Sequence, residues 1–113
     1  MTILEILKII AAVATIVTGL FAMVRPKSIE GFTGLTAPGS RGITEFRAVF
    51  GGFFIGLGAA PLFLGTPAYI MLGIAYLSVA VVRGFSMIFD RSVVQSNVIS
   101  IVTEIVLGVL LVL

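Results

Sequence analysis

Four long apolar runs dominate this sequence, and each is about as long as a helix that crosses a bilayer, roughly 20 residues. They cover about residues 3–24, 43–64, 68–89 and 93–113. With 59% hydrophobic and 11% charged residues in a chain of 113, a water-soluble domain could not bury this much apolar surface. We therefore expect an all-α integral membrane protein, a four-helix antiparallel bundle formed by one domain over residues 1–113.

The connections between the runs predict how the bundle is oriented. The connections after the first and third runs lie on one side of the bundle and carry the basic residues Arg25, Lys27, Arg41 and Arg91. The short connection on the other side, Gly65–Pro67, has no charge. Because basic residues are enriched in cytoplasmic loops, we expect both termini outside the bacterial cytoplasmic (inner) membrane.

Several kinds of function are disfavoured by composition. The chain has no Cys and no His, which removes thiol nucleophiles, disulfides and the usual zinc ligands. We expect no metal and no cofactor. The net charge of +2 without a basic block disfavours nucleic acid as a partner. No nucleophile or cofactor motif favours an enzyme.

Polar residues recur along the third and fourth runs. The third run carries a polar residue at every seventh position, so these residues share one helix face: Tyr69, Tyr76, Arg83 and Asp90. The fourth run has a face formed by Asn97, Ser100, Glu104 and Gly108. Charged groups within a span are costly unless they are paired, and they usually face the bundle interior. We expect Arg83 to pair with a carboxylate of another helix, either Glu45 or Glu104.

The second run combines two charges with little side-chain bulk. Glu45 and Arg47 are two residues apart, so on a helix they point in nearly opposite directions, and we expect one to face Arg83 or Asp90. Small residues follow in the same run and predict close helix packing: Ala48, Gly51, Gly52 and Gly56. The small residues, together with Phe-rich and Val-rich outer faces, also predict self-association. The lack of a soluble domain fits a subunit of a larger membrane complex.

The stretches "GITEFRAVFGGFFIGLG" and "RGFSMIFDRS", with a later Glu, resemble a family of small bacterial four-span membrane proteins known only as a domain of unknown function. The family is distantly similar to the DoxX-like group. Its pattern of Glu, Arg, Gly-Gly, Arg, Ser, Asp and Glu matches Glu45, Arg47, Gly51, Gly52, Arg83, Ser86, Asp90 and Glu104. The family usually has Gly after the Asp, where this chain has Arg91. The resemblance implies a fold and no activity.

The polar residues of the spans have two interpretations. They form either a buried ion network that only holds the helices together or a ligand site, and the set is Glu45, Arg47, Tyr69, Tyr76, Arg83, Asp90, Asn97 and Glu104. We favour a site for a lipophilic molecule such as a lipid, quinone or isoprenoid, or an accessory role in a membrane complex. A small proton- or cation-coupled transporter is the alternative.

Overall fold

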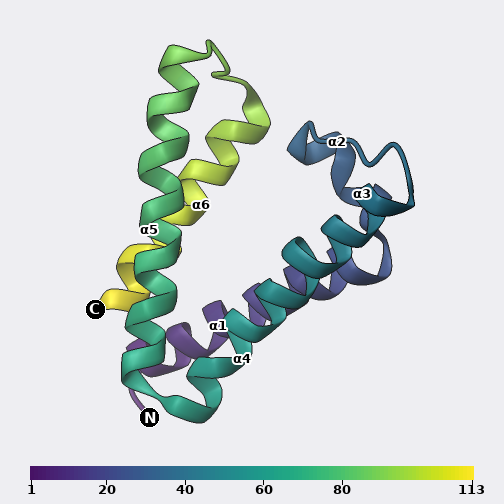
Figure 1. The fold of residues 1–113 in the computed structure, drawn as a ribbon. Coiled ribbons are helices and arrows are strands. Elements are labelled where there is room, and N and C mark those ends of the chain that lie inside the picture. Colours follow the sequence, from purple (N-terminus) through teal and green to yellow (C-terminus); the bar gives the residue numbers. More distant parts are fainter.

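The structure, a computed structural model, describes residues 1–113 and contains only helices and their connections (Figure 1). The first span is α1 (Ile3–Val24). A short segment follows, formed by the 3₁₀ turn η1 (Pro26–Ile29) and α2 (Glu30–Thr33). The second span is continuous from Ser40 to Leu64 and consists of α3 (Ser40–Glu45), the π-helix η2 (Phe46–Phe53) and α4 (Phe54–Leu64). The last two spans are α5 (Thr66–Phe89) and α6 (Gln95–Val112).

The prediction of an all-α bundle is confirmed. Four helices are long and apolar enough to cross a membrane, and their ends lie within about one turn of the predicted runs. Large apolar side chains are exposed on the outer faces, for example Phe63, Ile88 and Phe89, which are 86%, 72% and 76% exposed. A surface of this kind suits hydrocarbon better than water.

The four spans form two hairpins, the first made of α1 and the second span and the second made of α5 and α6, and each is packed through glycine. In the first hairpin, a Cβ added at Gly58 would lie 2.6 Å from the carbonyl oxygen of Ala12, so only glycine lets α4 approach α1 this closely. In the second hairpin, a Cβ at Gly73 would lie 2.9 Å from the carbonyl oxygen of Gly108. Close backbone approach through small residues is the usual means of helix packing in a membrane.

The two hairpins meet at one end and diverge toward the other (Figure 1). At the joined end, Ala11 of α1 packs with Leu72 of α5 and Leu111 of α6 in a small buried core. The connection from α4 to α5 turns at Gly65, whose φ of 78° and ψ of −149° suit glycine alone. The bundle is therefore open at the end that carries α2 and the α5–α6 turn.

The structure places the four small residues of the second span in two different environments. Gly51 is buried, and a Cβ there would lie 2.8 Å from the Cβ of Met23. In contrast, Ala48, Gly52 and Gly56 are exposed, and a Cβ at Gly56 would meet nothing within 4 Å. These three residues lie on the exposed side of the second span, so the contact between chains that their spacing allows stays a prediction.

Candidate functional site

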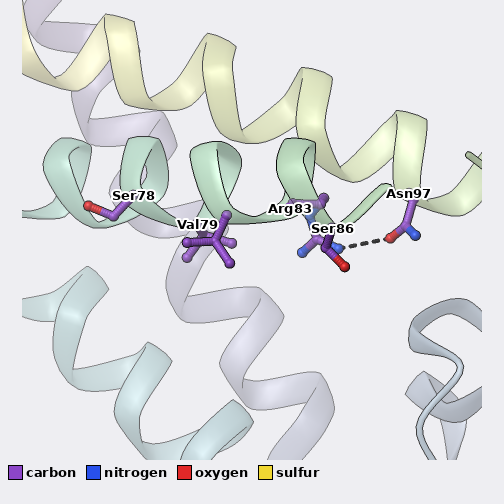
Figure 2. Close-up of a pocket in the computed structure, with 6 residues that line it drawn as sticks. Ser78, Val79, Arg83, Ser86 and Asn97 are labelled. Carbon is purple, nitrogen blue, oxygen red and sulfur yellow. Dashed lines mark hydrogen bonds between the residues drawn. The ribbon is translucent and has the colours of Figure 1, made fainter. Parts of the chain in front are cut away.

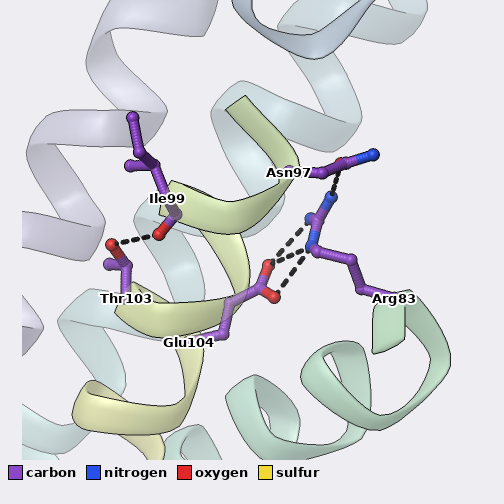
Figure 3. A network of polar contacts seen from close by, with 5 residues as sticks. All are labelled: Arg83, Asn97, Ile99, Thr103 and Glu104. Atoms are coloured by element: carbon purple, nitrogen blue, oxygen red, sulfur yellow. Dashed lines mark hydrogen bonds and ion pairs between the residues drawn. The ribbon is translucent and has the colours of Figure 1, made fainter. Parts of the chain in front are cut away.

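The centre of the candidate site is an ion pair between two neighbouring helices. Arg83 of α5 donates from Nε to Oε1 of Glu104 at 2.9 Å and from Nη2 to Oε2 at 2.8 Å (Figure 3). This two-pronged geometry is the strong form of the arginine–carboxylate interaction. The pairing of Arg83 with Glu104, one of the two predicted partners, is confirmed.

Glu104 lies far from both ends of its helix. Because α6 begins at Gln95, Glu104 lies about 14 Å along the helix, a distance of about half the thickness of a bilayer's hydrocarbon core, roughly 30 Å. Its side chain is 11% exposed, whereas that of Arg83 is 30% exposed. The carboxylate is thus enclosed, and the guanidinium borders open space.

Asn97 extends the pair toward the start of α6. Its Oδ1 accepts a hydrogen bond of 3.0 Å from Nη1 of Arg83, and its Nδ2 donates to the carbonyl oxygen of Ser92 at 2.9 Å. The second bond ties the side chain to the α5–α6 turn and so orients its amide. We call Arg83, Asn97 and Glu104 the polar cluster.

Tyr76 lies two helical turns before Arg83 and joins the two hairpins. Its hydroxyl lies 2.5 Å from Oγ1 of Thr15 on α1. The Thr15 hydroxyl already donates to the carbonyl oxygen of Ala11 at 2.9 Å. A hydroxyl has one proton, so Tyr76 must be the donor in this contact, and its own oxygen keeps free lone pairs.

A groove of about 710 Å³ lies between the hairpins, and the polar cluster forms part of its wall. Of its 20 lining residues, 12 are hydrophobic, including Val17 and Phe21 of α1 and Phe54 of α4. Phe32 of α2 lies at the wall on the open end of the bundle. The groove therefore combines apolar walls with a small number of polar groups, as small-molecule sites do.

A second hollow of about 540 Å³ lies along α5 and shares Arg83 and Asn97 with the groove. Figure 2 shows Ser78, Val79 and Ser86 projecting from α5 beside Arg83, with Asn97 hydrogen-bonded to the guanidinium. The guanidinium is therefore reachable from two adjacent hollows.

The remaining predicted site residues lie apart from the polar cluster. Glu45 is exposed and pairs with Arg41 one turn earlier on its own helix, so the prediction that Glu45 or Arg47 faces Arg83 or Asp90 is wrong. Arg47 is exposed and makes no ion pair. The reason is the divergence of the hairpins, which carries this end of the second span away from α5 (Figure 1).

The last two predicted residues occupy opposite ends of α5. Asp90 is exposed and accepts a hydrogen bond of 2.7 Å from the Ser86 hydroxyl. Tyr69 packs against the small core at the joined end. Neither residue lines the groove or the second hollow.

Sequence reasoning missed the contribution of the first hairpin and of α2. A signal for Thr15 was present in the sequence, because Thr15 shares a face of α1 with the small residues Ala12 and Gly19. Such a face is expected to pack against another helix. Phe32 is an apolar residue in a connection rich in Gly and Pro, which is a weak signal of a segment that packs back onto the bundle.

The fold and this site define a class, namely small all-helical proteins with four helices of membrane-spanning length and a polar cluster between two of them. The chain belongs to the family described as Domain of unknown function (DUF4345), whose model matches residues 3–113. No curated protein and no solved structure matches the chain.

Proposed function

We propose that this protein spans a bilayer and binds one lipophilic molecule in the groove between its hairpins, with the polar head of that molecule at the polar cluster. The observation that carries the proposal is the lining of the groove, which is largely apolar and contains the partly exposed guanidinium of Arg83. A lipid-like molecule has the matching division into an apolar chain and a polar head.

The size of the groove supports a small ligand. Its volume of about 710 Å³ lies within the range of small-molecule sites, roughly 300–1,000 Å³. The hairpins are joined at one end only, so a chain longer than the groove can leave between them toward the surrounding lipid (Figure 1). The transporter alternative has less support, because both oxygens of Glu104 already accept hydrogen bonds from Arg83.

The proposal is tested by photo-crosslinking in lipid nanodiscs with hexadecanol that carries a diazirine near its hydroxyl end. We expect labelled peptides from the groove residues of α1, α5 and α6. Replacement of Ala14, which lines the groove, with Trp fills the space and is expected to reduce this labelling at least severalfold. Labelling spread evenly over the outer faces would contradict the proposal.

A matched control lies next to Ala14 on the same helix. Val13 is 44% exposed and does not line the groove, so Val13→Trp places the same side chain on the outer face. We expect Val13→Trp to leave the labelling unchanged. An equal loss in both variants would show that the Trp acts on the fold rather than on the groove.

A further inference from the structure

The polar groups along the groove differ in whether their hydrogen-bond donors are already used. The hydroxyls of Thr18, Thr33 and Thr103 each donate to a carbonyl oxygen one turn earlier in the chain. The Tyr76 hydroxyl donates to Thr15, as argued above. These residues can therefore accept a hydrogen bond from a ligand, but they have no proton left to donate.

Free donors are concentrated at the polar cluster. A guanidinium has five N–H groups. The contacts of Arg83 leave one N–H on each terminal nitrogen without a protein partner. Asn97 keeps one N–H of its amide, because the other donates to Ser92. The Ser100 hydroxyl, one turn after Asn97 on the groove wall, makes no hydrogen bond within the protein. A ligand head placed here meets donors from three side chains.

The charge of the cluster distinguishes between neutral and anionic heads. Arg83 and Glu104 are the only charged residues that line the groove or the second hollow, so their charges cancel. An anionic head would approach a guanidinium that is already neutralised by a bidentate carboxylate, and it would meet the negative charge of Glu104 at close range. Within a low-dielectric region that repulsion is large, whereas an uncharged acceptor avoids it.

We propose that the ligand of this groove has an uncharged head with hydrogen-bond-accepting carbonyl oxygens, as a quinone has, and that Arg83, Asn97 and Ser100 donate to those oxygens. This inference rests on the proposed function and adds the chemical class of the head. Glu104 then has a defined part, because it orients the guanidinium and sets the net charge of the site to zero. No bond is made or broken in the binding step.

The inference is tested with three tritiated probes that share a decyl chain and differ in their head, namely benzoquinone, phosphate and phenyl. Binding is measured to the full chain in nanodiscs of uncharged lipid. We expect the benzoquinone probe to bind at least roughly tenfold more tightly than the other two, since each hydrogen bond that is made to an otherwise unpaired donor adds to affinity. Tighter binding of the phosphate probe overturns the inference, and so does equal binding of the benzoquinone and phenyl probes.

Two variants separate the donors from the charge. Ser100→Ala removes one free donor and no bond within the protein, so we expect severalfold weaker binding of the benzoquinone probe and unchanged binding of the phenyl probe. Glu104→Gln keeps the side-chain shape and makes the site positive, so we expect the preference to move toward the phosphate probe by roughly tenfold or more. An unchanged preference in a folded Glu104→Gln protein overturns the inference.

If no probe binds the parent protein, including the phenyl probe, the proposed function itself fails.

Discussion

The hydroxyl of Tyr76 lies 2.5 Å from Oγ1 of Thr15, and this is the only side-chain hydrogen bond between the two hairpins. Every other side-chain contact of this kind, including Arg83 with Glu104, lies within one hairpin. The polar link between the halves of the molecule is therefore a single bond near the joined end, beside the buried core formed by Ala11, Leu72 and Leu111.

Removal of this link is expected to weaken the junction of the hairpins. Tyr76→Phe deletes the donor and should lower the free energy of unfolding by roughly 0.5–1.5 kcal/mol, the usual net worth of one hydrogen bond. Thermal unfolding in detergent, followed by circular dichroism, measures the effect. Tyr69→Phe is the control, because the Tyr69 hydroxyl makes no hydrogen bond. Equal melting temperatures for the two variants would show that the Tyr76 contact contributes nothing.

The glycines of α4 offer a paired test of helix packing. Gly58→Ala should cost roughly 1–3 kcal/mol, because the new Cβ would lie 2.6 Å from a backbone oxygen of α1 that cannot move alone. Gly56→Ala, two residues earlier, adds the same methyl group in open space and should stabilise the helix by roughly 0.5–1 kcal/mol. Unfolding of both variants in detergent is the measurement. A destabilised Gly56→Ala protein would mean that this face is covered after all.

Replacement of one partner of the Arg83–Glu104 ion pair should destabilise the protein more than replacement of both partners. Arg83→Leu leaves the carboxylate of Glu104 enclosed and unpaired, and we expect a loss of roughly 3–5 kcal/mol. The double variant Arg83→Leu with Glu104→Leu should recover most of this loss, because no buried charge remains. Arg41→Leu is the control for an exposed pair and should cost about 1 kcal/mol or less. If Arg83→Leu melts at the parent temperature, the pair has no structural role.

Arg91 has a backbone conformation that suits glycine. Its φ of 51° is the only positive value at a non-glycine residue. Arg91→Gly should relieve the left-handed strain and raise the free energy of unfolding by roughly 0.5–1 kcal/mol. Ser92→Gly, at the next residue, relieves no such strain and should lower stability slightly. Chemical denaturation of both variants in detergent decides the matter, and a destabilised Arg91→Gly protein would count against the explanation.

The proposed orientation has a direct test, because the chain contains no cysteine. A single Cys added at either terminus should react with a membrane-impermeant maleimide in intact cells, since both termini are expected outside. A Cys in the α5–α6 turn, for example Ser92→Cys, should react only after lysis. The reverse pattern would invert the orientation and place the basic connections outside.

The number and limits of the spans could be predicted because they depend on local composition alone. The partner of Arg83 could be narrowed to two carboxylates, Glu45 and Glu104, since a charged residue inside a span needs a partner of opposite charge, and the structure selects Glu104. Heptad spacing placed Tyr76 and Arg83 on one face, and both line the groove. These inferences depend only on regular α-helical geometry.

The second span could not be predicted in the same way. The π-helix from Phe46 to Phe53 changes which residues share a face, and no pattern in the sequence marks where it begins. The divergence of the hairpins is a global property, and it decides that Glu45 pairs within its own helix instead of reaching α5. Spacing along one helix contains no information about the angle between two hairpins.

Because the hairpins are joined at one end only, a small rotation at the junction displaces the far end of each hairpin by a larger distance. From Tyr76 to Phe89, α5 extends about 20 Å beyond the hydrogen bond with Thr15. A rotation of about 10° at that junction would therefore displace the far end of the hairpin by about 3.5 Å. This displacement is close to the distance between two carbon atoms in van der Waals contact. The glycine packing inside each hairpin keeps the arms stiff, so such a rotation would change the width of the groove mouth without unpacking either pair of helices.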